Sequence, residues 1–316
     1  MAKAFASTAD LAQKKVTFAK LADGVYAYTA EGDPNSGIII GDDGVMVIDA
    51  RATPAMAQDL IRRVRQVTDK PFKYVVLTHY HAVRVMGASA FEAPYIISSH
   101  HTRELIVERG KQDFKSEVGR FPRLFDSVET VPGLTWPNMT FERSMTIFMG
   151  KREIWLMHLG RAHTKGDIVA WLPKEKILFS GDLVEQGATP YCGDAYLAEW
   201  PQTLERAKSL GARKLVPGRG EAMMTPAASR RAIEATRAFI VAMMREVRKG
   251  ARARRPLKQV YEAAYARLQP AYGKWVIFDH CLPFNITRAY DEALGVRHPR
   301  IWTASRDREM WRALQS

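Results

Sequence analysis

The chain has 316 residues, of which 47% are hydrophobic and 26% are charged, a balance that suits a globular protein with a sizeable core. It contains no apolar run near ~18 residues, which argues against a membrane span. Residues 1–15 are polar and Ala-rich, without the apolar stretch of a signal peptide. Two isolated cysteines, Cys192 and Cys281, are too few for a disulfide framework. We therefore expect a cytoplasmic protein with no membrane partner.

The formal net charge of +13 is confined to the last part of the chain. Residues 1–200 contain 24 Lys and Arg against 24 Asp and Glu, whereas residues 201–316 contain 23 against 10. Such asymmetry can mark a nucleic-acid partner. The densest basic run, Arg245–Arg255, lacks the interleaved aromatic residues that stack on bases. A solvated helical surface, or one that faces another subunit in a homo-oligomer, is the simpler explanation, so nucleic acid is not the expected partner.

The first hundred residues alternate strand patterns with helical ones. Apolar runs bounded by turn residues predict strands at 16–21, 24–29, 37–40, 44–49, 74–78 and 95–99. Residues 53–67 repeat apolar side chains at helical spacing, which predicts an amphipathic helix, and a second helix is expected to start within 84–91.

Residues 102–133 are expected to form a long connection with a short helix around 102–109. Aromatic and basic side chains there suit a lid over an anionic or aromatic substrate, although ordinary loop packing explains them equally well. They are Phe114, Arg120, Phe121, Arg123 and Phe125, with Trp136 just beyond. Further strands are expected at 145–148, 154–158, 168–171 and 176–179, and helices at 200–209, 226–249, 257–268, 284–294 and 305–315.

Two histidines one residue apart, His79 and His81, follow the strand at 74–78. Side chains alternate along a strand, so residues i and i+2 point to the same side and can bind one metal ion together. Asp49 ends a neighbouring strand at the same edge, where it either supports the site through hydrogen bonds or caps the following turn. His100 and His101 are interpreted as a polar strand end rather than as ligands.

Three later blocks strengthen the metal interpretation. They are Gly160–Asp167 around His163, Ser180-Gly181-Asp182, and Pro217-Gly218-Arg219-Gly220. With the His79 block, and in this order, they resemble the metallo-β-lactamase superfamily over roughly residues 16–245. The family pattern is Thr-His-x-His-x-Asp-His, a single His before Gly-Asp, then Ser-Gly-Asp and Pro-Gly-His-Gly.

The resemblance implies an α/β fold, the four-layer αββα sandwich. We expect a metallo-β-lactamase-like domain over residues 16–250 and a helical C-terminal extension, residues 251–316, packed on it. By position, His79, His81 and His163 match the family's first metal site, and Asp182 matches the carboxylate that bridges two metals in dinuclear members.

The chain departs from the pattern at the second metal site. Val83 stands where the family has Asp, and Arg84 and Arg219 stand where it has His. Valine has no donor atom and a guanidinium cannot ligate. We therefore expect one zinc per chain, with iron or manganese as alternatives. The arginines either pair with Asp182, favoured for Arg219, or address a carboxylate or oxyanion. For Arg84 a third interpretation is that it points away from the metal.

Three histidines with an open position are typical of catalytic zinc, which lowers the pKa of its water to ~7. The expected function is a metallo-hydrolase that uses a single zinc-bound hydroxide on a small-molecule ester, lactone, amide or activated aryl substrate. Asp182 would orient the attacking water or take its proton, and Arg84 or Arg219 would hold the oxyanion. The alternatives are a non-hydrolytic iron-dependent protein and a catalytically silent binding protein.

One segment of the tail, residues 275–285, places Asp279, His280 and Cys281 together inside an aromatic, strand-like sequence. One interpretation is that it folds over the metal site and supplies His280 or Asn285 to substrate. The other is an ordinary core segment with a satisfied histidine.

Overall fold

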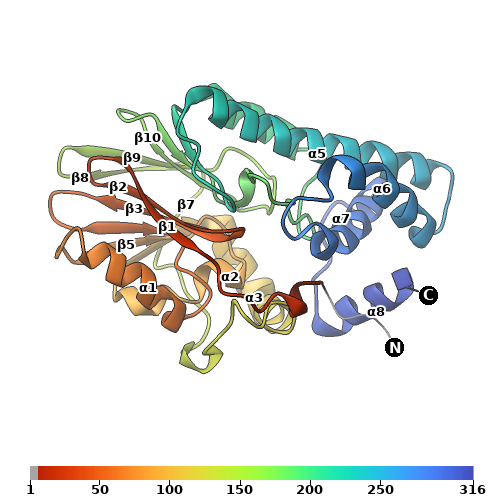
Figure 1. The fold of residues 1–316 in the computed structure, drawn as a ribbon, viewed down its shortest axis with the longest axis horizontal. Coiled ribbons are helices and arrows are strands. Elements are labelled where there is room, and N and C mark those ends of the chain that lie inside the picture. Colours follow the sequence, from red (N-terminus) through yellow and green to blue (C-terminus); the bar gives the residue numbers. More distant parts are fainter. Residues whose placement is uncertain (1–5, 316) are drawn as a thin grey trace.

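The computed structural model describes residues 6–315 and is organised around two β-sheets (Figure 1). The first sheet has seven strands in sequential order: β1 (Val16–Ala22), β2 (Val25–Ala30), β3 (Asp33–Ile40), β4 (Val45–Ile48), β5 (Phe72–Val76), β6 (Tyr95–Ser99) and β7 (Met139–Phe141). The second sheet has five, in the order β12-β11-β10-β9-β8: β8 (Ser144–Met149), β9 (Arg152–Met157), β10 (Val169–Leu172), β11 (Ile177–Phe179) and β12 (Lys214–Val216).

The pairing within the first sheet explains where its functional edge lies. Strands β1 to β4 form an antiparallel meander, whereas β4, β5, β6 and β7 are mutually parallel. Ile48, the last residue of β4, pairs with Val76, the last residue of β5. Because the carboxyl ends of parallel strands meet at one edge, Asp49 and the segment that carries His79 emerge together, as the sequence predicts.

The sheets pack face to face through an apolar core. Ile39, Met46 and Val76 from the first sheet meet Leu156 and Leu172 from the second, and each of these side chains is fully buried. The approach is close at Gly37, where an added Cβ would lie 2.5 Å from the ring of Phe179. A side chain at this position would therefore separate the sheets.

Helices cover both outer faces, which gives the predicted four-layer αββα sandwich. They are α1 (Pro54–Arg65), α2 (Ala82–Val85), α3 (His100–Arg120), α4 (Trp200–Ser209), α5 (Pro226–Arg252), α6 (Leu257–Tyr272), α7 (Phe278–Ala293) and α8 (Ala304–Gln315), with short 3₁₀ turns η1 (Ala6–Ala9), η2 (Ala88–Phe91), η3 (Val128–Thr130) and η4 (Gly181–Leu183). Helix α1 packs on the outer face of the first sheet, and α4 and α5 pack on that of the second. Thr53 caps α1 by accepting a 3.1 Å hydrogen bond from Met56 N–H.

Four expectations about local structure are wrong. The 102–133 connection is mainly a helix, α3, that runs from His100 to Arg120. The buried face of this helix carries Arg109, Asp113 and Glu117. The helix therefore lacks the continuous apolar stripe from which an amphipathic helix is predicted. His100 and His101 begin this helix rather than end a strand.

The helix expected to start within 84–91 is instead two short pieces, α2 and η2. Residues 275–285 are not a strand, because α7 begins at Phe278 and a single bridge joins Val276 to Ala188.

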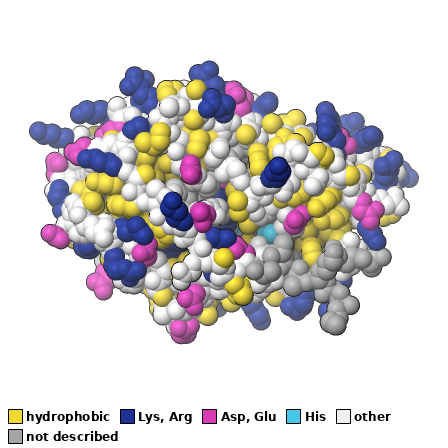
Figure 2. Space-filling model, viewed as in Figure 1, with side chains coloured by type: hydrophobic (Ala, Val, Ile, Leu, Met, Phe, Trp, Pro, Cys, Tyr) yellow, Lys and Arg dark blue, Asp and Glu magenta, His cyan; other side chains and the backbone are white. Residues whose placement is uncertain are grey.

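Helices α6 and α7 extend the apolar core of the second sheet. Val260 of α6 and Phe278 of α7 are buried in the same apolar cluster as Phe239 of α5 and Leu178 of β11. The proposed division at residue 250 stays a prediction. Lys and Arg side chains are spread around the visible outline of the molecule, including the end that α5 and α6 form (Figure 2). None of the helices in the described part of the chain is long and apolar enough to cross a membrane.

Candidate metal centre

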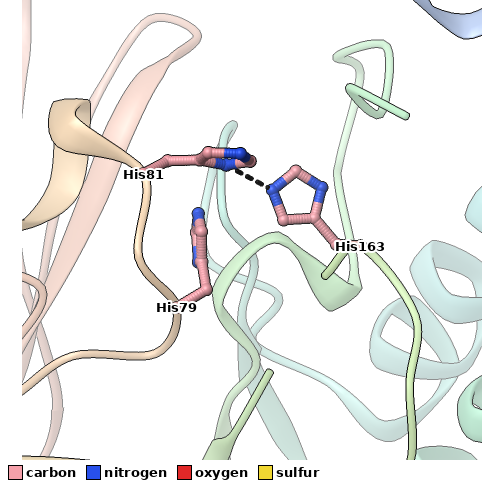
Figure 3. Close-up of side chains that lie close together, drawn as sticks. All are labelled: His79, His81 and His163. Atoms are coloured by element: carbon pink, nitrogen blue, oxygen red, sulfur yellow. Dashed lines mark hydrogen bonds between the residues drawn. The ribbon is translucent and has the colours of Figure 1, made fainter. Parts of the chain in front are cut away.

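His79, His81 and His163 come together at the edge between the two sheets (Figure 3). His79 and His81 lie in the segment between β5 and α2, and His163 lies in the loop between β9 and β10. That loop is shaped by Asp167, which accepts hydrogen bonds from the backbone N–H (3.0 Å) and the hydroxyl (2.5 Å) of Thr164. The three candidate ligand atoms lie within 4.8 Å of one another, and all three side chains are buried.

In each histidine, one ring nitrogen is hydrogen-bonded to a neighbouring group and the other points toward the centre. Thr78 Oγ1 donates to Asp49 (2.8 Å) and so accepts from His79 Nδ1 (3.0 Å). His163 Nδ1 donates to the carbonyl of Tyr191 (2.8 Å), and His81 Nε2 donates to Asp194 (3.2 Å). These partners fix the tautomers, so the inward atoms are His79 Nε2, His81 Nδ1 and His163 Nε2.

The inward atoms fit a metal ion. His79 Nε2 is buried and has no hydrogen-bond partner in the described structure. His81 Nδ1 and His163 Nε2 are 2.9 Å apart (Figure 3), although their outer contacts leave a lone pair on each. Two facing lone pairs repel, so either a proton or a metal ion must lie between His81 and His163, and a metal ion would satisfy all three inward atoms at once.

Burial and nearby carboxylates set the charge of these histidines. Burial lowers the pKa of His79 well below its usual range, and burial with the charge of His81 lowers that of His163 to about 3. Burial alone would also lower the pKa of His81, but Asp113 and Asp194 raise it to about 9. A metal ion and a proton therefore compete for His81.

Asp182, in η4 after β11, completes this side of the centre. Its Oδ2 lies 3.6 Å from both His79 Nε2 and His163 Nε2. Burial alone would raise the pKa of Asp182, but the guanidinium of Arg84 and the other charges around it hold the pKa below its usual range. The carboxylate is therefore an anion that faces His79 and His163.

Arg84 occupies the place beside Asp182 and does not point away from the centre. Its side chain is 1% exposed, its Nη2 contacts Asp182 Oδ1 and donates to the carbonyl of Gly218 (2.6 Å), and its Nη1 donates to the carbonyl of Asn35 (3.0 Å). Nη1 also lies 3.4 Å from Asp49. Sequence reasoning favoured Arg219 as the partner of Asp182, but Arg84 is the closer of the two.

Arg219 lies on the other oxygen of Asp182. Its Nη1 is 3.5 Å from Asp182 Oδ2 and 3.9 Å from Glu185 Oε1. Val83 is buried in the apolar core outside the first sheet. The residues at the family's second-site positions thus place two cations and an apolar side chain around Asp182. The catalytic roles of Asp182, Arg84 and Arg219 stay predictions.

Helix α3 supplies supports that sequence reasoning missed. Asp113 accepts a hydrogen bond from Ala82 N–H (2.8 Å), and Glu117 accepts one from Val83 N–H (2.9 Å). Arg109 donates to Asp194 (2.9 Å), the partner of His81. The spacing of these three residues, four apart along the chain, was the available signal, because it puts them on one helix face.

The residues predicted to form a lid lie in different parts of the structure. Phe114 and Phe125 pack in the core around the first sheet, Arg123 pairs with Asp33 (2.5 Å), and Trp136 is 47% exposed. Phe121 packs against the same core, and Arg120 lies 5.5 Å from the ring of Tyr191, beside the centre.

The tail also contributes to the centre. Asn285 holds the segment that carries Tyr191, since its Nδ2 donates to Pro190 O (2.8 Å) and its Oδ1 accepts from Cys192 N–H (2.7 Å). Both groups of its amide are engaged by the protein, so Asn285 is a support rather than a substrate ligand. His280 is 1% exposed and lies 4.4 Å from the ring of Phe121.

Comparisons with known proteins agree with this fold. The family profile "Metallo-beta-lactamase superfamily" matches residues 29–219. The chain belongs to the metallo-β-lactamase superfamily. It is 28% identical over 201 residues to the metallo-beta-lactamase type 2 of Bacillus cereus, covering 61% of this chain and 70% of that protein. It is 24% identical over 219 residues to that of Bacteroides fragilis, covering 65% and 80%.

Solved structures show the same fold. A metallo-beta-lactamase from Pontibacter korlensis superimposes with a TM-score of 0.54 at 21% identity, covering 70% of this chain and 99% of the other. Membership of the superfamily supports a metal-dependent hydrolase at the level of the family, with His79, His81 and His163 as a group able to hold the metal.

Proposed function

We propose that the protein is a metallo-hydrolase with a single metal, which acts on a small ester, lactone, amide or activated aryl substrate. The observation that carries this proposal is the convergence of three inward imidazole nitrogens whose outer nitrogens are all engaged. When bound, a divalent ion such as zinc acts as a Lewis acid and lowers the pKa of a water to about 7. The protein supplies the rest of the site.

A single metal is favoured by the charges around Asp182. Arg84 contacts one oxygen of this carboxylate and Arg219 lies 3.5 Å from the other. A second dication beside Asp182 would face two fixed positive charges in a buried region, where Coulomb repulsion is weakly screened. Neither guanidinium can deprotonate to become a ligand.

The residues around the centre suit distinct roles. Asp182 Oδ2 faces His79 and His163 at 3.6 Å, so it can accept a hydrogen bond from a water held there and orient it. Because Arg84 keeps the pKa of Asp182 low, the carboxylate is a weak base and orients better than it removes a proton. Arg219 is the cation placed to meet negative charge that develops on the substrate.

Metal analysis combined with a substrate panel tests this proposal. We expect close to one tightly held metal per chain in protein purified without chelator, and turnover of at least one chromogenic ester or lactone. His163→Ala should lose both metal and turnover. His100→Ala, at a residue whose side chain is 52% exposed and outside the centre, should keep both.

Three outcomes would contradict the proposal. Two metals per chain that survive dialysis would exclude the mononuclear centre. Bound iron with no hydrolysis would favour the non-hydrolytic alternative. A folded protein with neither metal nor turnover would favour a binding protein.

A further inference from the structure

A cleft of about 620 Å³ lies beside α1, apart from the metal centre. Residues from the start of the first sheet, from α1 and from the segment after α3 line it, and its described lining includes no residue of the candidate metal centre. Its volume is in the range of small-molecule sites. Apolar side chains on its wall include Val16, Tyr28 and Met56, and five cations also line it: Lys14, Arg51, Arg62, Arg63 and Arg123.

Four of these five cations have a carboxylate partner. Lys14 pairs with Asp10 (2.7 Å), Arg62 and Arg63 with Asp59 (3.2 and 2.8 Å), and Arg123 with Asp33 (2.5 Å). Arg51 is the exception, because it forms no ion pair with any residue that the structure describes. It is also the most deeply buried of the five, at 4% exposure.

The guanidinium of Arg51 has few contacts with the protein. Its Nη1 donates to the carbonyl of Pro34, and its Cζ lies 4.8 Å from the centre of the Tyr28 ring. Its Nε is buried without a hydrogen-bond partner, and its Nη2 donates to no described residue. A buried charge without a counter-ion is costly, so an anion in the cleft would satisfy a cation that the protein leaves unpaired.

The backbone around Arg51 also favours an anion at this wall. Arg51 has a φ of 69°, in the left-handed region that a long side chain rarely adopts, and such conformations gather at ligand sites. Helix α1 begins three residues later at Pro54, and its described first turn contains no acidic residue. Because Met56 of that turn lines the cleft, the partial positive charge of the helix N-terminus adds to that of Arg51.

We propose that this cleft binds a small organic molecule with one carboxylate and an apolar body. The carboxylate pairs with Arg51, since a guanidinium and a carboxylate form charge-assisted hydrogen bonds. The apolar body lies against Tyr28, Met56 and Val16. The site is separate from the metal centre and does not depend on the proposed hydrolase function.

The charges around the cleft favour one carboxylate over a dianion. Asp33, Asp59 and Asp126 line the cleft with the five cations, and Asp10 pairs with Lys14. The four carboxylates leave one positive charge uncompensated, and the unpaired cation is Arg51. A phosphate dianion would bring a second negative charge close to these carboxylates, which would repel it.

Calorimetry on the protein as purified tests the site with 4-phenylbutyrate as the probe. We expect this carboxylate to bind and to raise the melting temperature. We expect 4-phenylbutanamide, its neutral counterpart of the same shape, to bind at least about tenfold more weakly. Equal binding of the two, or no binding of the carboxylate, would overturn the proposal. Tighter binding of inorganic phosphate than of 4-phenylbutyrate would overturn the choice of a single carboxylate.

Variants assign the binding to Arg51. Arg51→Gln should weaken 4-phenylbutyrate binding by about 10- to 100-fold, because it removes a charged hydrogen-bond donor. Arg51→Asn should weaken it equally and should fold, since asparagine adopts the left-handed conformation more readily than other residues. The matched control is Arg62→Gln, which removes the same charge from the same cleft. The Arg62 side chain is 67% exposed and already pairs with Asp59, so this change should weaken binding by less than about fivefold.

Two further outcomes would contradict the assignment. Equal losses of affinity in Arg51→Gln and Arg62→Gln would show only a general attraction of the basic surface for anions. A carboxylate can also bind a metal ion, so His163→Ala is the second control and should bind 4-phenylbutyrate as wild type does. Affinity that is lost in folded His163→Ala, but kept in Arg51→Gln and Arg51→Asn, would place the carboxylate at the metal centre and overturn the proposal.

Discussion

The two sides of the metal centre are stabilised in different ways. On the histidine side, each imidazole is held by one outer partner, which is Thr78, Asp194 or the carbonyl of Tyr191. On the arginine side, a permanent cation, Arg84, is locked between Asp182 and two backbone carbonyls. The first side keeps its inward atoms available for a metal ion. The second side already contains its positive charge.

This difference is the physical basis of the proposed single-metal centre. A buried carboxylate such as Asp182 needs positive charge nearby, because an unpaired buried anion is costly. A metal ion or a guanidinium can supply that charge, but only the guanidinium is covalently part of the chain and present before any metal binds. We therefore expect the arginine side to govern folding and the histidine side to govern metal affinity.

Removal of Arg84 should have the largest effect on stability. Arg84→Met would leave Asp182 and Asp49 buried without their shared cation, and breaking a buried pair in this way typically costs about 3–5 kcal/mol. Denaturant unfolding of the metal-free protein measures this cost. Arg219→Met is the matched comparison and should cost less, because Arg219 makes no hydrogen bond to Asp182. Equal costs for the two variants would show that Arg84 has no special structural role.

A change to the outer partner of His81 should act mainly on the metal. Asp194→Asn removes the carboxylate that orients His81 and binds Arg109, and loss of such a partner typically lowers metal affinity about 10- to 100-fold. Competition with a chromogenic chelator gives the affinity. A metal affinity within twofold of wild type would contradict the division between the two sides.

Much of this arrangement follows from the sequence. The position of His79 and His81 at a strand end places them at the sheet edge. The blocks around His163 and Asp182 bring the remaining groups to the same edge, and Val83, Arg84 and Arg219 mark the altered second site. The αββα layers follow from the family resemblance and from alternating strand and helix patterns.

What could not be predicted is how the polar groups share partners. Helix α3 buries Arg109, Asp113 and Glu117, residue types that usually mark an exposed face, so its length and its contacts with α2 were hidden. Asn285 and His280 occupy one short sequence segment, yet one supports a backbone loop and the other packs against the ring of Phe121. Such distinctions depend on side-chain geometry, which residue spacing does not specify.

The smallest expected effect concerns the cysteine on the arginine side. Burial raises the pKa of Cys281 to about 12, although Arg219 lowers it in part. A thiol with a folded-state pKa above its unfolded value contributes stability that is fully present below about pH 9 and is lost as the pH rises toward 12. Wild type should therefore lose stability between pH 8 and pH 11 more steeply than Cys281→Ala, measured by denaturant unfolding at each pH. Cys281 should also resist thiol reagents at pH 8, because the thiolate is the reactive form. Two outcomes would contradict this prediction: parallel pH profiles for wild type and Cys281→Ala, or rapid labelling of Cys281 in the folded protein. Either would mean that Cys281 is more open to solvent than its 1% exposure indicates.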